Sequence, residues 1–166
     1  METVEEFLAH AIRLEREAAD RFDQLADAMK TSGNLGVAKL FRQLADYSRL
    51  HLADARERSG YRKIPDLAPH EFEWPDNESP ESAAIWAADP LIGPEEALDT
   101  ALAAEMAGLA YYSGILETTT DPEIRAFARE FVDEENGHVV ELKRWIAARQ
   151  AGRSEPIGAS FQTPPG

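Results

Sequence analysis

The sequence predicts an all-α protein built as an antiparallel four-helix bundle, with a long crossover between the second and third helices. Three observations lead to this prediction. Four long segments have apolar residues at helical spacing, their ends carry helix start and stop signals, and no comparable alternating strand pattern is present. At 166 residues, the chain is long enough for one domain with a sizeable core and too short to expect two.

The ends of the expected helices are marked by capping residues. Thr3 and Glu6 have the spacing of a capping box at the start of the first helix, and Pro94 and Pro122 stand at the first positions of the third and fourth. Gly60 ends the second helix. The helices are therefore expected over about residues 3–30, 35–59, 93–118 and 121–151.

The segment between the second and third helices, residues 60–93, is rich in proline and acidic residues. Its length suits a crossover along the outside of a bundle better than a tight turn, because the helices that it joins need not then be antiparallel neighbours. A short helix is expected within it at about Glu81 to Ala88. Trp74 and Trp86 are expected to hold the segment against the bundle.

The bundle is expected to occupy residues 1–152, and residues 153–166 are expected to form an extended or disordered tail from which Phe161 could dock on a neighbour. The N-terminus is acidic where a signal peptide would be basic, and no apolar run is long enough to span a bilayer. We therefore expect a cytoplasmic protein that makes no use of a membrane.

Composition narrows the partners and the chemistry. The formal net charge of −14 disfavours nucleic acid and anionic lipid and favours small cations. With no cysteine, the chain has no disulfide, zinc finger, iron–sulfur cluster or thiolate nucleophile. Any metal must therefore be held by oxygen and imidazole ligands.

A single carboxylate interrupts the apolar stripe of the first helix, and another interrupts that of the third. In each helix an aromatic residue follows the acid two turns later: Phe22 follows Glu15, and Tyr112 follows Glu105. The two helices therefore repeat one pattern. Their stripes are Val4, Leu8, Ala11, Glu15, Ala18, Phe22, Leu25 and Met29, and Leu98, Ala101, Glu105, Gly108, Tyr112 and Ile115.

The second and fourth helices repeat each other as well. His51 and His138 hold equivalent places, and Ser48 stands where Glu135 stands, three residues before the histidine. The protein therefore looks like two copies of one helical hairpin. The aligned stripes are Val37, Leu40, Leu44, Ser48, His51, Ala55 and Arg58, and Ile124, Phe127, Phe131, Glu135, His138, Leu142 and Trp145.

Several carboxylates and imidazoles buried in one bundle need a shared partner. A buried carboxylate without a partner shifts its pKa and becomes neutral, whereas a divalent metal satisfies several ligands at once. Residues three apart share a helix face, so Glu135 and His138 can face one ion, and His51 can face it from the other hairpin. Iron or manganese is favoured, with zinc and copper as competitors.

These motifs resemble the rubrerythrin-like branch of the ferritin-like di-iron carboxylate superfamily. The likeness spans about residues 1–150, with one motif at Ala11–Phe22 and the other at Ala101–Tyr112. It implies a ferritin-like bundle that holds two irons. By resemblance, the ligands are Glu15 and Glu105 as terminal carboxylates, His51 and His138 as imidazoles, and Glu135 as a carboxylate that bridges the metals.

The chain departs from this family pattern at three points. Ser48 stands at the place of the second bridging carboxylate, which leaves three glutamates instead of four; Tyr47 and Asp54 are near that place but out of register. Leu102 stands where typical rubrerythrins have an additional glutamate. The absence of cysteine excludes a rubredoxin-type iron centre, so an external electron donor is expected.

The resemblance implies a homodimeric non-haem iron protein that oxidises Fe²⁺ and reduces peroxide or oxygen. An alternative is a bundle with one metal or none that serves as a binding or structural module, as Ser48 suggests. Iron storage in a shell of subunits is a third interpretation. A metal-free alternative is a structural network, in which His51 and His138 hydrogen-bond the buried Glu15 and Glu105.

The remaining polar residues near the motifs are assigned ordinary roles. Tyr112 is expected to pack in the core, where its hydroxyl could orient a ligating carboxylate. His10 and His70 are expected at the surface. Glu17 and Glu134, which are next to the proposed ligand turns, are expected to be solvated and not to bind metal.

Overall fold

The computed structural model describes residues 3–60, 62–74 and 91–157, and these contain long helices, one short helical turn and no strand. The prediction of an all-α four-helix protein is confirmed, with helix ends within one or two residues of those expected. The helices are α1 (Val4–Thr31), α2 (Leu35–Arg58), α4 (Pro94–Thr118) and α5 (Pro122–Gln150), and the short turn is η1 (Pro69–Glu71).

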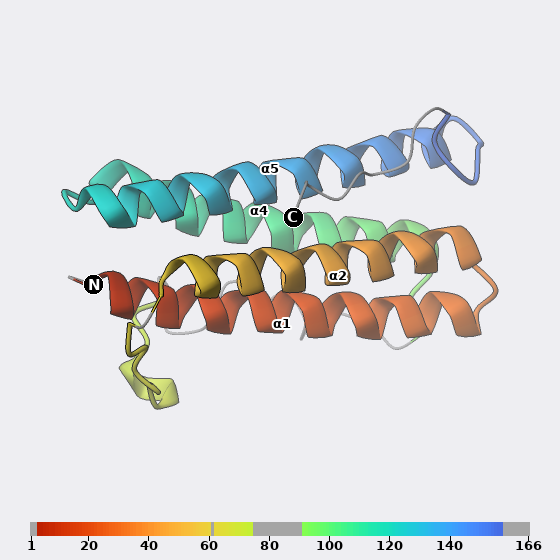
Figure 1. Ribbon diagram of the computed structural model, residues 1–166. Helices are drawn as coiled ribbons and strands as arrows, with labels where there is room; N and C mark the ends of the chain where they lie inside the picture. Colours follow the sequence, from red (N-terminus) through yellow and green to blue (C-terminus); the bar gives the residue numbers. More distant parts are fainter. Residues whose placement is uncertain (1–2, 61, 75–90, 158–166) are drawn as a thin grey trace.

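Two antiparallel hairpins make up the bundle, with α1 packed on α2 and α4 packed on α5 (Figure 1). The crossover changes the direction of the second hairpin. Because α2 ends and α4 begins at opposite ends of the bundle, these two helices run in the same direction. All four helices can therefore present residues from their middle turns to one central region.

The helix ends are capped as the sequence predicts. The Thr3 side chain accepts a hydrogen bond from the backbone N–H of Glu6 over 3.1 Å. At α5, the Asp121 carboxylate accepts hydrogen bonds from the N–H groups of Glu123 and Ile124 over 2.8 and 3.3 Å. Such caps satisfy donors that have no partner within the helix.

The apolar core has two parts. One cluster includes Phe22 and Phe41, and the other includes Phe7, Tyr112 and Phe131. On α1 and α5, the buried acidic residues lie between the segments that supply these two clusters. The polar centre is thus enclosed by packed side chains on either side along the bundle axis.

The crossover is fixed to α1 by His10, so the prediction that His10 is at the surface is wrong. His10 is 2% exposed. Its Nδ1 donates to the carbonyl of Glu6, and its Nε2 accepts from the N–H of Glu73, each over 2.8 Å. The Trp74 ring packs edge-on against the imidazole, which confirms the expected role of Trp74. His70 is exposed, as predicted.

Parts of two sequence predictions fall outside the described residues: the short helix at Glu81 to Ala88 with Trp86, and the docking of Phe161. Of the expected tail, residues 153–157 are described. Arg144 of α5 donates from Nη2 to the carbonyl of Ile157 over 3.0 Å, which holds this segment near the end of α5. The extension of the tail beyond it stays a prediction.

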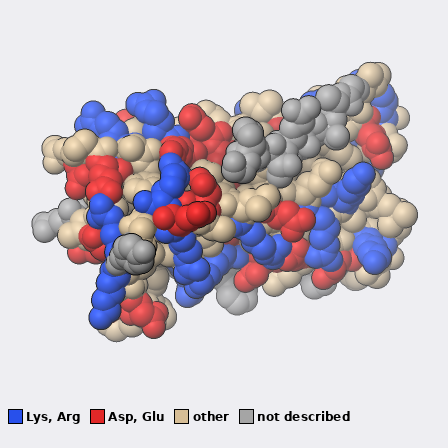
Figure 2. All heavy atoms as spheres, viewed as in Figure 1, with Lys and Arg blue, Asp and Glu red and all other residues tan. Residues whose placement is uncertain are grey.

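Basic and acidic side chains are interspersed on the face of the molecule in Figure 2. Several form ion pairs between α1 and α2, as Arg42 does with Asp23 and Asp27, and Arg49 with Asp23. None of the helices in the described ranges has the length and apolar character needed to cross a membrane.

Candidate metal centre

Buried polar side chains from all four helices meet in the middle of the bundle. The helical periodicity turns these residues away from water, because they continue the apolar stripes of their helices. They are Glu15 and Arg21 on α1, Ser48 on α2, Glu105 on α4, and Glu134, Glu135 and His138 on α5, and the partly buried His51 of α2 lies beside them.

Every side chain expected from the sequence to bind metal is buried or nearly so. Glu105, Glu135 and His138 are fully buried, and Glu15 is 1% exposed. His51 is the most accessible, with 14% of its side chain exposed. The burial of so many ionisable groups would destabilise the folded protein without a cation, because each buried negative charge loses its hydration.

Glu105 is held by a cation and an imidazole. Arg21 donates from Nη2 to Oε1 of Glu105 over 2.9 Å, and Nδ1 of His138 lies 3.1 Å from Oε2. Burial raises the pKa of Glu105, but contacts with Glu135 and His138 and the charge of Arg21 outweigh it and lower that pKa to about 2. Glu105 is therefore ionised in the folded protein.

Glu15 is oriented by an aromatic hydroxyl, as the sequence suggested. The Tyr112 hydroxyl donates to Oε1 of Glu15 over 3.0 Å. Burial, with the nearby charge of Glu105, raises the pKa of Glu15 to about 7. Burial also raises the pKa of Tyr112 well above its usual range, so the hydroxyl keeps its proton and remains a donor.

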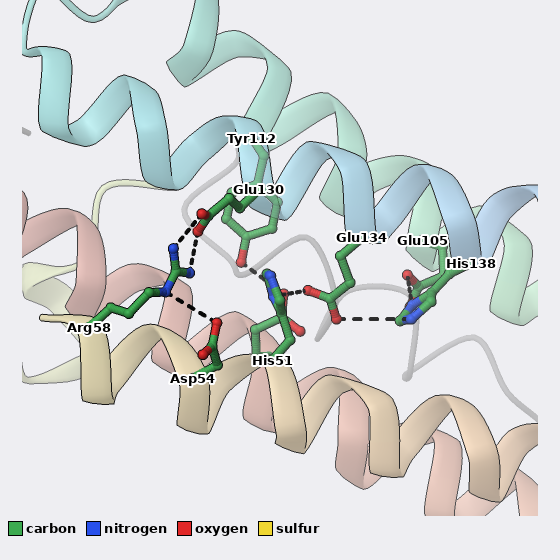
Figure 3. Close-up of polar contacts among 9 residues, drawn as sticks. His51, Asp54, Arg58, Glu105, Tyr112, Glu130, Glu134 and His138 are labelled. Carbon is green, nitrogen blue, oxygen red and sulfur yellow. Dashed lines mark hydrogen bonds and ion pairs between the residues drawn. The ribbon is translucent and has the colours of Figure 1, made fainter. Parts of the chain in front are cut away.

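The prediction that Glu134 is solvated is wrong. Glu134 is 3% exposed and points into the centre between the two histidines (Figure 3). Its Oε2 lies 2.5 Å from Nδ1 of His51, and its Oε1 lies 3.9 Å from Nε2 of His138. Glu17, by contrast, stays outside the centre and pairs with Arg13 over 2.6 Å.

Two groups of side chains have the geometry to hold metal ions. In each, one ligand atom per residue lies within 4.8 Å of the others: Glu105, Glu135 and His138 form the first group, and Glu15, Glu134 and Glu135 form the second. Glu135 belongs to both. A carboxylate shared in this way suits the bridging position that the resemblance implies.

The oxygen atoms of the centre fit a cation. Both carboxylate oxygens of Glu135 and Oε2 of Glu15 are buried and accept no hydrogen bond from the described residues. Burial and the charge of Glu105 raise the pKa of Glu135 well above its usual range. A buried oxygen without a donor is costly, so these atoms are better satisfied by metal ions than by the protein alone.

Residues considered as substitutes for the carboxylate missing at Ser48 do not take its place. Asp54 faces the surface and pairs with Arg58 over 3.1 Å, and Arg58 also pairs with Glu130 of α5 (Figure 3). The ring of Tyr47 packs edge-on against His138. Ser48 itself is buried in the centre.

Arg21 and Glu134 are the members of the centre that sequence reasoning missed. The expected stripes follow spacings of three and four residues and run beside both positions. An interval of seven residues would have found both. The residues at this interval that are buried are Phe7, Leu14 and Arg21 on α1, and Phe127, Glu134 and Glu141 on α5. These residues widen the inward faces of α1 and α5 beyond the narrow stripes.

Comparison with known proteins agrees with this architecture. The family model described as Rubrerythrin matches residues 6–86. The crystal structure of an uncharacterised conserved protein from Magnetospirillum magnetotacticum MS-1 is 34% identical, has a TM-score of 0.72, and is matched over 95% of this chain and 99% of that chain.

A hypothetical protein from Pyrococcus furiosus shares the fold, with 20% identity, a TM-score of 0.57, and coverage of 91% of this chain and 92% of that chain. No curated protein matches the chain. The match to the family model, the extended similarity to the Magnetospirillum protein and the repeated motifs in the bundle together show that the chain belongs to the rubrerythrin family.

Proposed function

We propose that the protein binds two iron ions and couples the oxidation of Fe²⁺ to the reduction of peroxide or oxygen. The observation that supports this most is Glu135, a fully buried carboxylate shared by two groups that could each hold a metal. The proposed ligands are Glu15, His51, Glu105, Glu135 and His138. The match to the rubrerythrin family supports a di-iron type of centre.

When bound, two Fe²⁺ ions would supply two electrons, which with two protons reduce one hydrogen peroxide to two waters. The side chains prepare the centre for this. Tyr112 fixes one oxygen of Glu15, and Arg21 fixes one oxygen of Glu105, so both carboxylates are oriented before a metal arrives. The aromatic rings of Phe22 and Phe131 pack edge-on against His138 and His51, which holds both imidazoles in place.

Several further features belong to this proposal. We propose a homodimer, and an external electron donor to return the irons to the ferrous state, because the chain has no cysteine for a rubredoxin-type iron centre. Oxygen and nitrogen ligands accept iron, manganese and zinc, so the ligands alone do not select the metal. We propose iron because the proposed reaction is the oxidation of Fe²⁺.

A direct test is anaerobic titration of the Fe²⁺-loaded protein with hydrogen peroxide, followed by absorbance of the ferric product. The proposal predicts that one equivalent of peroxide oxidises two irons. The Glu135→Gln variant should lose this stoichiometry, while Glu141→Gln, which changes a buried glutamate bonded to Trp145, should keep it. Peroxide consumption with no iron oxidation would contradict the proposal.

A second candidate is a bundle with a single metal that acts as a binding module. Arg21 favours this candidate. Its buried positive charge, paired with Glu105, weakens the attraction of the centre for a second cation. The metal content of the loaded protein separates the two candidates, since this one predicts a single ion per chain.

A further inference from the structure

Ser48 leaves a carboxylate missing from α2, and a different helix places one in the same region. We propose that Glu134 of α5 supplies this ligand, so that one helix provides Glu134, Glu135 and His138 and α2 provides His51 alone. This inference rests on the proposed two-metal function. It assigns a metal-binding role to a residue outside the repeated motif.

The position of Glu134 supports the assignment. Glu134 is one turn before His138 on α5 and is 3% exposed, although a glutamate beside a buried glutamate would ordinarily turn to solvent. One of its oxygens lies within 4.8 Å of ligand atoms of both Glu15 and Glu135. Both oxygens also approach imidazole nitrogens, with Nδ1 of His51 at 2.5 Å.

The small side chain at position 48 is complementary to Glu134. Ser48 is 1% exposed and lies in the same polar centre. A glutamate in place of Ser48 would bring one more negative charge against Glu134, which would cost free energy in a buried centre.

The charges support the same assignment. With Glu134, the centre has four carboxylates, which are Glu15, Glu105, Glu134 and Glu135, and together with Arg21 and two divalent ions they leave a net charge of about +1. Without Glu134, the same two ions and Arg21 would face three carboxylates and leave about +2, which is less favourable in a buried site. The carboxylate that α2 lacks at Ser48 is then supplied by Glu134 of α5, so the half-site keeps its ligand.

The test compares the metal content of variants after anaerobic loading with Fe²⁺ and removal of unbound metal. Glu134→Gln keeps the shape of the side chain and removes its charge. The wild type and the control Glu141→Gln should hold two irons, and Glu134→Gln should hold one. The double variant Ser48→Glu with Glu134→Gln should hold two again, because the carboxylate returns on α2.

Loading with Co²⁺ gives a readout that does not depend on redox activity, since the visible absorption of Co²⁺ reports its ligands. The Glu134→Gln variant should change this spectrum, and helix content measured by circular dichroism shows whether it folds. If Glu134→Gln does not fold, the spectrum of Glu134→Asp, which keeps the charge and shortens the side chain, must differ from that of wild type.

Equal metal content and equal Co²⁺ spectra in wild type, Glu134→Gln and Glu134→Asp would overturn the assignment of Glu134. Failure of the proposed function gives a different result, in which the wild type itself retains one iron or none. A wild type with two irons and a Glu134→Gln variant with two irons therefore rejects this inference alone.

Discussion

Arg21 of α1 donates a 2.9 Å hydrogen bond to Glu105 of α4, and both side chains are buried beside the candidate ligands. The pair connects the two hairpins at the polar centre. It fixes one carboxylate in its ionised form and places a permanent positive charge where cations are expected to bind. Each property leads to a measurable consequence.

Replacing Arg21 with methionine should destabilise the metal-free protein by about 3–5 kcal/mol, because removal of one partner leaves a buried charge uncompensated. The loss should be smaller in the metal-loaded protein, where an ion takes the place of the guanidinium. Urea unfolding of both forms measures this difference. The control Arg49→Met, which breaks a pair with the partly exposed Asp23, should cost less than about 1 kcal/mol.

The Tyr112→Phe variant should keep the metal count and weaken metal affinity by roughly 10- to 100-fold, because Glu15 loses the hydroxyl that orients it. Competition with a chelator measures the affinity. Tyr111 offers a matched control: it is 8% exposed, and its hydroxyl has no hydrogen-bond partner among the described residues. Equal affinities of Tyr111→Phe and Tyr112→Phe would contradict a role for the hydroxyl.

The metal-free protein should lose stability as the pH rises above about 6.5, through the raised pKa of Glu15 at about 7. The folded-state pKa of Glu15 is raised to about 7, and those of Glu134 and Glu135 are raised well above the usual range. The folded state therefore holds protons that the unfolded state has already released, and the free energy of unfolding falls with rising pH until the folded state releases them too. Below this window, His51 opposes the trend, because burial lowers its pKa to about 4 and its stability contribution falls as pH falls.

Thermal unfolding across this pH range tests the linkage. The melting temperature of the metal-free protein should fall with rising pH, and metal loading should remove the decrease, because the ions take the place of the protons. A melting temperature that is flat or rising as the pH passes from 6.5 through about 7 in the metal-free protein would show that the carboxylates are not protonated in the folded state.

Replacing His10 with leucine should release the crossover from α1. The variant loses the bonds to Glu6 and Glu73 and should be destabilised by about 1–3 kcal/mol. Trypsin should then cleave faster after Lys63, within the crossover. The control His70→Leu changes an exposed histidine of the same segment and should not alter the cleavage rate.

The sequence was enough to predict the fold, because long periodic helices with clear caps depend on local physics. It also predicted the burial of Glu15, Glu105, Glu135 and His138, because each continues an apolar stripe that faces the core, at a position that recurs in the other hairpin. The sequence also allowed the Tyr112 hydroxyl to orient a ligating carboxylate, and the structure identifies that carboxylate as Glu15.

The roles of His10 and Glu134 could not be predicted from a narrow stripe. His10 is buried only because the crossover covers α1 at that point, which is a tertiary contact over a long separation in sequence. Glu134 is buried because α5 faces two neighbouring helices, so residues on both sides of its stripe point inward. Neither effect appears in the periodicity of one helix.

The number of irons bound per chain distinguishes a two-metal centre from a bundle with one metal or none. The wild-type protein is loaded anaerobically with Fe²⁺, freed of unbound metal and subjected to elemental analysis. Two irons per chain are predicted, because Glu135 is shared by two groups of ligands and four carboxylates offset most of the positive charge of two divalent ions and Arg21. One iron per chain, or none, would contradict the two-metal centre.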